Sequence, residues 1–547
     1  LAVGPPTNLG TAVDTLEVRG LADPDTPAPQ DGGEAAPRRD LLLGLVCLVL
    51  VALIVADRAR ILRQFGFLYT DEDQAVLWYT AEDLRRGHVR APYFYGQTYG
   101  SWFEALAAVP LRAWNVALRH ALPIAGTFFS LVPGLLLAAV AWRRQARLAA
   151  AAILTGYLLM STEAVAAASL PRGLAPGIAL ATMGVALAAL WAPRAPAMIG
   201  FGLLATLGAS FNESSLLVSV PAAAFFTLQY WRKGQMWLTL TLGVELGLVF
   251  HVLASAFYTS HPSYDVHWRW PLVLTSEQLR NSGTHLQDYF TAYSFDFLRT
   301  PVVPFALLAV AAVLLIARRG LPGLAATVAA LAGGAATLSA AKAVDGSPSV
   351  FFPYFRFFFA LPALLALLAV LACRDRPLRP WVSRSAAGLL LIASVAGFVH
   401  RGDNLDSELR RLTASDSEGR YQAPTLTEWA LEDCRQTGHL AVAHEARLVV
   451  YLKDRVAPYL CAAELYGDVR TLFPQYERRT WELERESTVP RTRMMVAGAG
   501  PDFCTNADAV ATWCHQVSQR LDLVMVEFPS QPVVPLLPRL GVNVPAF

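Results

Sequence analysis

Residues 41–56 read LLLGLVCLVLVALIVA, and the run Thr70-Asp71-Glu72-Asp73 follows shortly after them. An apolar stretch of this kind is typical of a segment that crosses the roughly 30 Å hydrocarbon core of a membrane. Three adjacent carboxylates then stand at a bilayer surface, where they repel one another and the lipid phosphates. The acidic run therefore needs a ligand or a structural partner.

The composition of the whole chain agrees with a membrane location. Of its 547 residues, 54% are apolar and 16% are charged, and the mean hydropathy is +0.38. A soluble protein carries about 25% charged residues. We therefore predict a mainly α-helical, polytopic membrane protein. The net charge of +2 gives no reason to expect a nucleic-acid partner.

Basic residues orient the predicted spans. Arg38-Arg39 precede the first apolar run, so the positive-inside rule keeps them in the cytoplasm and puts the acidic run outside. If 102–118 and 122–142 both crossed the membrane, Arg143-Arg144 would lie outside. We therefore predict that 102–118 is partly interfacial or re-entrant, which keeps Arg143-Arg144 inside and gives about eleven transmembrane helices in total. Besides 41–56 and 122–142, we predict spans at 148–169, 173–191, 197–211, 214–230, 236–257, 301–317, 322–342, 353–373 and 381–400.

This topology divides the chain into three parts. Residues 1–38 are rich in Pro, Gly, Ala and Asp and are expected to form a disordered cytoplasmic tail. Residues 39–402 form the membrane domain, with external loops at 57–102 and 258–300. Residues 403–547 are expected to form a small external α/β domain. Its expected strands are Leu440–Ala443, Arg493–Val496 and Leu521–Phe528.

Four of the six cysteines lie in the C-terminal domain, which indicates disulfides in an oxidising compartment. Four cysteines permit three pairings, and we favour Cys434 with Cys461 and Cys504 with Cys514. Free buried thiols are the alternative. Gly498-Ala499-Gly500 precedes Pro501 and lacks the third glycine of a dinucleotide-binding turn, so a nucleotide-sugar donor is not expected there.

The acidic run has a purely structural explanation. Thr70 is expected to cap a helix that runs to about Arg86, with Asp73 at its third position and Gly87 as its end. Acids in the first turn would stabilise that helix by a few tenths to about 1 kcal/mol. Because capping needs one acid and this chain has three, we favour a substrate or a metal as their partner.

The segment after this helix interleaves aromatic residues with Gly96 and Gly100. Flat rings and amide groups are what a sugar site offers, although aromatic residues also gather at membrane interfaces without any catalytic role. The candidate substrate-binding residues of this segment are Tyr93, Tyr95, Gln97 and Tyr99.

These motifs together resemble the GT-C superfamily of integral membrane glycosyltransferases, which includes protein O-mannosyltransferases and aminoarabinose transferases. Asp71-Glu72 stands where the family has Asp-Glu, and Gly87 and Pro92-Tyr93 match its Gly and Pro-Tyr. Residues 95–100 are similar to the segment before the family's second span. The resemblance covers 41–400 in layout and is specific over 69–104.

A second, weaker match lies near the end of the membrane domain. Tyr354-Phe355-Arg356-Phe357 with Pro362 is similar to the Arg-Tyr and Pro pattern of a late family span, although Phe357 replaces the usual tyrosine.

The resemblance implies transfer of a sugar from a polyprenyl-phosphate-linked donor to an acceptor hydroxyl of a protein, lipid or glycan. The reaction would take place at the external face of a bacterial inner or plasma membrane. Asp71 would be the general base. Glu72 would bind substrate or, with Asp73, hold Mg or Mn, which prefer oxygen ligands.

The leaving phosphate would need a cation at the external surface. Arg172, Arg269 and Arg356 stand at expected external turns, where lipid headgroups could equally occupy them. Glu163 interrupts an apolar stretch and is a candidate second acidic ligand, because acids at membrane depth are expensive and therefore functional by default.

Two other classes of protein compete with a glycosyltransferase. A transporter or flippase would also be polytopic, but we find no internal repeat, and a large external domain is unusual for a carrier. A non-catalytic scaffold or sensor would leave the acidic loop unexplained. The sequence therefore favours a membrane glycosyltransferase.

Overall fold

The structure is a computed structural model. It describes residues 35–264, 275–284, 286–339, 359–373, 380–414, 425–500, 502–507 and 511–544. The chain forms two units, 1–42 and 43–547, and the first is represented only by the start of a helix. Most of the predicted tail, Arg269 and Arg356 lie outside the described residues.

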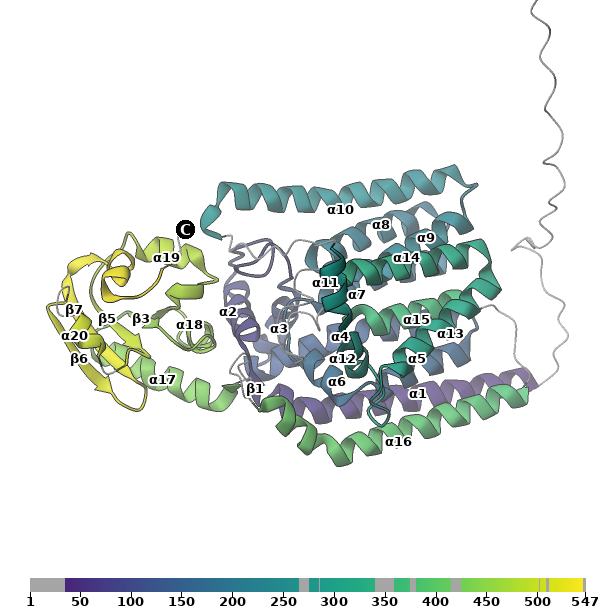
Figure 1. The fold of residues 1–547 in the computed structure, drawn as a ribbon, viewed down its shortest axis with the longest axis horizontal. Coiled ribbons are helices and arrows are strands. Elements are labelled where there is room, and N and C mark those ends of the chain that lie inside the picture. Colours follow the sequence, from purple (N-terminus) through teal and green to yellow (C-terminus); the bar gives the residue numbers. More distant parts are fainter. Residues whose placement is uncertain are drawn as a thin grey trace, which may run out of the picture. The chain divides into compact units, whose positions relative to one another are not determined.

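The first part of the chain is a bundle of apolar helices (Figure 1). In the part of the chain that the structure describes, six segments are long and apolar enough to cross a membrane, and four shorter apolar helices accompany them. The bundle consists of α1 (Ala35–Ile61), α4 (Leu118–Arg143), α5 (Arg147–Leu159), α7 (Ala175–Trp191), α8 (Ala195–Phe211), α9 (Leu216–Gln229), α10 (Gly234–Ser260), α13 (Val302–Arg319), α14 (Leu321–Leu338), α15 (Leu361–Ala372) and α16 (Pro380–Thr413).

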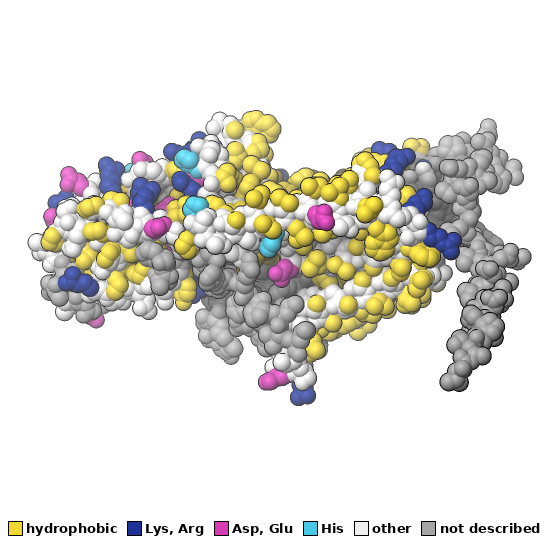
Figure 2. All heavy atoms as spheres, turned by 90° about the horizontal axis from the view of Figure 1, so that it is seen from above, with side chains coloured by type: hydrophobic (Ala, Val, Ile, Leu, Met, Phe, Trp, Pro, Cys, Tyr) yellow, Lys and Arg dark blue, Asp and Glu magenta, His cyan; other side chains and the backbone are white. Residues whose placement is uncertain are grey.

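The outer surface of this bundle is apolar. Hydrophobic side chains cover the helical part in Figure 2, and charged side chains gather at its ends. Large exposed residues include Leu238 and Leu253 of α10, Val313 of α13 and Leu331 of α14. Such a surface is unstable in water and is expected of helices that face lipid. The prediction of a polytopic membrane protein is confirmed.

The predicted span at 148–169 differs in detail from the structure. The stretch 148–169 is not one helix, because α5 ends at Leu159 and α6 (Thr162–Ser169) begins after Ser161, whose hydroxyl accepts a hydrogen bond from the Ala164 amide at 3.1 Å. Within 102–118, α3 (Phe103–Ala113) has 11 residues. At about 1.5 Å per residue, α3 is too short to cross a bilayer. This length agrees with the prediction that 102–118 is interfacial or re-entrant.

The remaining short helices lie between the spans. Helix α2 (Glu72–Arg85) follows strand β1 (Tyr69–Thr70), and α11 (Ser276–Thr284) and α12 (Leu286–Ala292) belong to the second predicted external loop. Strand β1 pairs with β2 (Thr425–Leu426), which opens the C-terminal domain. Because α16 continues to Thr413, the domain boundary predicted at 402 falls inside this helix.

The C-terminal domain contains a five-stranded sheet in the order β4-β3-β5-β7-β6. Its strands are β3 (Leu448–Tyr451), β4 (Arg470–Leu472), β5 (Pro490–Ala497), β6 (Trp513–Ser518) and β7 (Leu523–Pro532). Strand β3 runs parallel to both β4 and β5, and β7 is antiparallel to β5 and β6. Helices α17 (Thr427–Ala443), α18 (Ala457–Glu464), α19 (Thr480–Glu486) and α20 (Phe503–Ala507) accompany the sheet.

The predicted α/β class of this domain is confirmed, and one strand was predicted wrongly. Residues Leu440–Ala443 form the last turn of α17, and the strand follows at Leu448–Tyr451. A run of only four apolar and β-branched residues is compatible with either a buried helix end or a strand, so the sequence pattern alone could not decide between them.

Both predicted disulfides are present. Cys434 of α17 bonds Cys461 of α18, and Cys504 of α20 bonds Cys514 of β6. Cys47 and Cys373 are half-buried and take no part in these two disulfides. The first disulfide joins two helices on the same side of the domain, and both of its sulfur-bearing residues are buried.

We expect the change of Cys434 and Cys461 together to serine to loosen the C-terminal domain. The disulfide separates its cysteines by 27 residues, and a cross-link of that length contributes about 3 kcal/mol by restricting the unfolded chain. Hydrogen exchange of β3 and β5 in the full-length protein should accelerate. The matched control is the change of Cys47 and Cys373 to serine, and equal exchange in both double variants would contradict the prediction.

Candidate active site

Asp71 is the N-cap of α2. Its Oδ1 accepts a hydrogen bond from the Gln74 amide at 2.9 Å, so Asp71, and not Thr70 as predicted, caps the helix. Thr70 is instead a buried residue of β1 and pairs with Thr425. The helix ends near the predicted residue, since Gly87 has φ +78° and its amide donates to the Leu84 carbonyl at 3.0 Å.

Arg172 holds the other oxygen of Asp71. It stands in the turn between α6 and α7, its side chain is 3% exposed, and its Nε and Nη2 lie 2.8 and 2.5 Å from Asp71 Oδ2. Two nitrogens of the guanidinium group thus contact the same carboxylate oxygen, so a cation and the candidate base are in direct contact. The structure therefore brings together two of the predicted site residues.

The other two acids of the run bind Arg478 of the C-terminal domain. Arg478 Nε lies 3.0 Å from Glu72 Oε1, and Nη1 lies 2.6 Å from Asp73 Oδ1. Burial raises the pKa of Glu72, and the charge of Arg478 opposes that rise. Each acid of the run thus has an arginine partner, and the two arginines come from segments far apart in the sequence.

The segment after α2 fits closely against Arg478. Gly96 has φ +74°, and a Cβ atom there would lie 2.6 Å from the Cβ of Arg478 and 2.8 Å from its carbonyl oxygen. The Arg478 guanidinium also stands 5.8 Å from the centre of the Phe94 ring. Only glycine allows the loop backbone to come this near at this backbone angle.

The same segment is tied to the membrane domain. The Gly100 amide donates to the Phe211 carbonyl at 2.7 Å, and the Ser101 amide donates to the Gly173 carbonyl at 2.8 Å. The Gly96-to-Ser101 loop therefore connects the C-terminal domain, the end of α8 and the turn that carries Arg172.

The aromatic residues predicted to contact a sugar mostly pack in the core. Tyr93 is 2% exposed, stacks on Tyr258 and lies 3.2 Å from His251 Nδ1 through its hydroxyl. Tyr95 is 1% exposed and donates to Asp83 at 3.1 Å. Neither ring lines the cavity described below, and both are packed against other protein groups.

The structure also describes the surroundings of three further predicted site residues. Gln97 is buried and its carbonyl accepts a hydrogen bond from Tyr258 at 3.0 Å, and Tyr99 is half-buried. Glu163, at the start of α6, pairs with Arg411 of α16 at 3.1 Å. These contacts do not connect Glu163 to Asp71.

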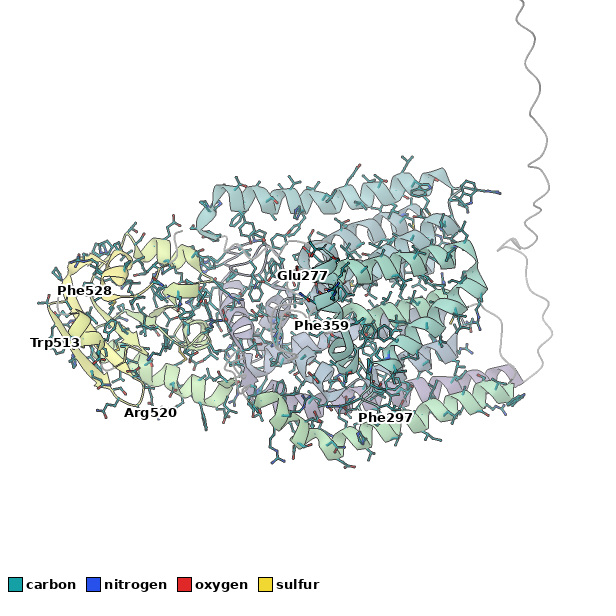
Figure 3. All side chains as sticks on the ribbon, viewed as in Figure 1. Glu277, Phe297, Phe359, Trp513, Arg520 and Phe528 are labelled. Atoms are coloured by element: carbon teal, nitrogen blue, oxygen red, sulfur yellow. A yellow bond between two sulfur atoms is a disulfide. The ribbon has the colours of Figure 1, made fainter. Side chains whose placement is uncertain are left out.

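A cavity lies next to the Asp71–Arg172 pair. It measures about 740 Å³ with its open part included and is bounded mostly by apolar residues of α4, α6, α7 and α15. Phe359, which is labelled in Figure 3, forms part of its wall. The charged residues of its lining are Arg58, Glu104 and Arg172.

Four buried ionisable residues of this region escaped the sequence analysis. Arg58 and Arg401 both bind Asp57 at the end of α1, and Arg401 Nη2 also donates to the Leu158 carbonyl at 2.9 Å. The sequence did contain a sign of Asp57 and Arg58, because these two charged residues directly follow the first apolar run. Glu104 was also missed, although it opens the apolar stretch that becomes α3.

Glu104 supports the turn that carries Arg172. Its Oε2 accepts a hydrogen bond from the Gly173 amide at 2.6 Å. Burial raises the pKa of Glu104 from its ordinary value of 4.5 to about 8, against the opposing effect of the Gly173 and Arg172 amides. The side chain is therefore mainly protonated at neutral pH.

The described residues do not fit the predicted metal site. Within the described ranges, no group of three or more His, Cys, Asp or Glu side chains could hold a metal ion. Glu72 and Asp73, the predicted ligands, both face the guanidinium of Arg478. A cation would have to displace this arginine, so we derive no chemical step through a metal.

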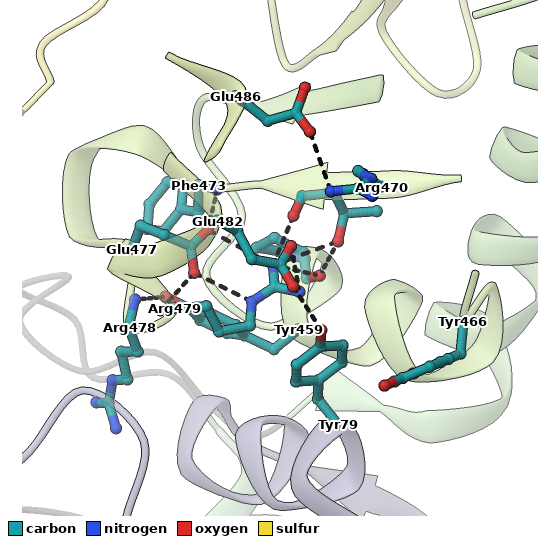
Figure 4. Close-up of polar contacts among 12 residues, drawn as sticks. Tyr79, Tyr459, Tyr466, Arg470, Phe473, Glu477, Arg478, Arg479, Glu482 and Glu486 are labelled. Carbon is teal, nitrogen blue, oxygen red and sulfur yellow. Dashed lines mark hydrogen bonds and ion pairs between the residues drawn. The ribbon is translucent and has the colours of Figure 1, made fainter. Parts of the chain in front are cut away.

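The C-terminal domain contacts α2 beyond its first turn. Figure 4 shows Tyr79 of α2 bonded to Glu482, whose carboxylate also faces Arg479, and Tyr466 beside it. The Tyr466 hydroxyl donates to Asp83 of α2. These contacts fix α2 against the domain over most of its length.

We expect Arg478→Gln to destabilise the start of α2, because it leaves Glu72 and Asp73 largely buried without a cation. Breaking a buried ion pair costs about 3 kcal/mol. Gly96→Ala should act on the same contact by pushing Arg478 away. Hydrogen exchange of residues 72–76 in the full-length protein measures both effects.

The control for these variants is Arg493→Gln in the same domain. Arg493 pairs with Glu445 at 2.8 Å and with Glu527 at 3.6 Å, both in the C-terminal domain. Exchange rates in 72–76 that are the same in Arg478→Gln and in Arg493→Gln would show that Arg478 does not hold the acidic run.

Glu104 predicts a pH dependence of stability. In the unfolded chain it ionises near its ordinary pKa of 4.5, so between about pH 4.5 and pH 8 the folded protein binds the additional proton. Stability should fall as pH rises through that window. Glu104→Gln, a neutral isostere, should remove this fall, as seen in thermal midpoints measured across the window. If the thermal midpoints of the wild type and of Glu104→Gln changed with pH in parallel, Glu104 would not be the group responsible for the fall in stability.

Comparisons with known proteins give matches in structure only. No family model matches the chain, and no curated protein matches its sequence. The crystal structure of ArnT from Cupriavidus metallidurans in the apo state is similar, with TM-score 0.53 and 13% identity over 88% of this chain and 97% of that chain. ArnT bound to undecaprenyl phosphate gives TM-score 0.52 and 14% identity, with the same coverage.

A third structure is more distant. The archaeal oligosaccharyltransferase AglB from Archaeoglobus fulgidus, in complex with an inhibitory peptide and a dolichol-phosphate, has TM-score 0.40 and 11% identity over 82% of this chain and 69% of that chain. The likeness to ArnT, an aminoarabinose transferase, confirms the predicted resemblance at the level of the fold. The chain thus has the GT-C fold, a multi-pass membrane helix bundle followed by a small α/β domain.

Proposed function

We propose that this protein transfers a sugar from a polyprenyl-phosphate-linked donor to an acceptor hydroxyl at the external face of a bacterial inner or plasma membrane. The observation that carries the proposal is the contact between Asp71 and Arg172 at the edge of an apolar cavity. A carboxylate and a buried arginine beside apolar walls suit a substrate that joins a phosphate to a hydrocarbon chain.

The cavity has the chemistry that such a donor requires. Its apolar lining accepts prenyl groups, which gain about 25 cal/mol per Å² of surface removed from water. Arg172 supplies the charge-assisted hydrogen bonds that a phosphate needs, in a site with little access to water. The likeness to ArnT, which has been solved with undecaprenyl phosphate bound, supports this choice of carrier.

Asp71 is suited to the role of general base. Its Oδ1 is held by the Gln74 amide, whereas Arg172 is the partner that the described residues provide for its Oδ2. When a donor phosphate binds Arg172, it competes for the guanidinium and leaves Oδ2 free to accept the proton of the acceptor hydroxyl. The acceptor oxygen then bonds to the anomeric carbon as the bond from that carbon to the phosphate oxygen breaks.

Glu72 and Asp73 have a supporting role in this scheme. Their pairing with Arg478 places one positive charge between two neighbouring negative charges, so a phosphate that approaches Asp71 meets less repulsion. The two disulfides of the C-terminal domain agree with its location in an oxidising compartment outside the membrane.

We expect Asp71→Asn to abolish transfer in the purified protein supplied with a polyprenyl-phosphate sugar, because an amide cannot accept the hydroxyl proton. Asparagine caps helices as well as aspartate does, so the fold should survive. Loss of a general base reduces such rates by about 100- to 10,000-fold. Transfer is measured as radiolabelled sugar released from the donor onto the acceptor fraction.

Thr70→Ala is the matched control, because Thr70 is buried beside Asp71 but does not cap α2 or bind Arg172. It should retain most of the activity. Full activity in Asp71→Asn would exclude Asp71 as the base, while an inactive wild-type protein with every polyprenyl-linked sugar tested would count against the proposed reaction itself.

A further inference from the structure

A second hollow lies at the opposite end of α2 from Asp71. It measures about 1110 Å³ with its open part included and runs between α2, the α3–α4 connection and helices α17 and α18. Five arginines line it, and we call it the arginine groove. These arginines are Arg85, Arg86, Arg112, Arg119 and Arg435.

The groove carries more positive than negative charge. Glu82 and Glu464 are the acidic residues of its lining. Glu82 pairs with both Arg85, at 2.8 Å, and Arg112, at 3.4 Å, and Glu464 pairs with Arg435 at 3.0 Å. Two carboxylates neutralise two of the five guanidinium groups, so three positive charges remain in excess.

Arg86 and Arg119 supply most of this excess. Arg86 stacks 4.3 Å from the centre of the Tyr466 ring, and among the described residues no carboxylate pairs with it. Arg119 reaches Glu428 at 2.8 Å, but Glu428 is 69% exposed and is outside the lining. An exposed pair of this kind is weak and yields readily to a competing anion.

Side chains next to the groove are of the kind that gathers at a membrane interface. Trp114, which follows α3 two residues after Arg112, is 76% exposed, and Leu106 of α3 is exposed as well. Exposed tryptophan and leucine on a short amphipathic helix are typical of the membrane interface. A molecule held in the outer leaflet can therefore present its polar head to the groove.

We infer that the arginine groove binds a phosphate group carried by a molecule at the external membrane surface. Several guanidinium groups around one hollow match a phosphate group, which offers two free oxygens and one negative charge as a diester, or three free oxygens and up to two charges as a monoester. The phosphate belongs either to an anionic phospholipid or to the acceptor, and the second source rests on the proposed function. At about 1.5 Å per residue, Arg85 and Arg86 at the end of α2 lie about 20 Å along the helix from Asp71. The groove shares no lining residue with the cavity beside Arg172, so the two are separate.

The decisive variant is Arg86→Gln together with Arg119→Gln, which removes two charges without depriving Glu82 or Glu464 of a partner. The full-length protein is titrated in neutral detergent with short-chain phosphatidylglycerol and, separately, with glucose 1-phosphate as a stand-in for a phosphorylated glycan. We expect the dissociation constant of the probe that binds to rise about tenfold in the double variant. Binding should also weaken with added salt.

Two further variants make the test specific. Glu464→Gln removes the carboxylate that pairs with Arg435 and should tighten binding of the probe. This variant and the Arg86→Gln, Arg119→Gln double variant should therefore change the affinity in opposite directions. Arg493→Gln, which lies outside the lining, should leave it unchanged.

Each outcome is informative. Groove-dependent binding of phosphatidylglycerol alone identifies a phospholipid headgroup, and groove-dependent binding of glucose 1-phosphate identifies a phosphorylated acceptor. Affinities that are the same in all four proteins, or no binding of either probe, would overturn the inference. Neither probe depends on sugar transfer, so failure of the proposed reaction would leave this result interpretable.

Discussion

Two arginines pair with the three adjacent carboxylates at the start of α2, and the remainder of the site depends on this pairing. Asp71 binds Arg172 of the membrane domain, while Glu72 and Asp73 share Arg478 of the C-terminal domain. Three like charges on consecutive, largely buried residues would otherwise repel one another and lose their hydration. The pairing therefore fixes where the α6–α7 turn and the C-terminal domain can lie.

Much of this architecture could be predicted from local features of the sequence. Apolar runs with flanking arginines gave the helices of the bundle, and four cysteines in one segment gave both disulfides. The acidic run gave the helix that carries the site. Arg172 was a candidate because it interrupts an apolar stretch at an external turn.

The contacts between distant segments could not be predicted in the same way. Arg478 is separated from Asp73 by 405 residues and lies in a stretch with many other charged residues, so its sequence neighbourhood gives no sign of its role. Tyr93 and Tyr95 resemble surface aromatics in sequence, yet both are buried by residues from α10 and the C-terminal domain. Burial of this kind is decided by tertiary packing, which periodicity does not report.

Gly96 has a consequence for how the two domains can evolve. Its backbone lies against the backbone of Arg478 with no room for a side chain between them. A domain boundary of this kind is not a flexible tether, and the C-terminal domain is not an interchangeable module. A homologous domain could replace it only if its loop matched the first external loop atom by atom, so the two segments have to change together.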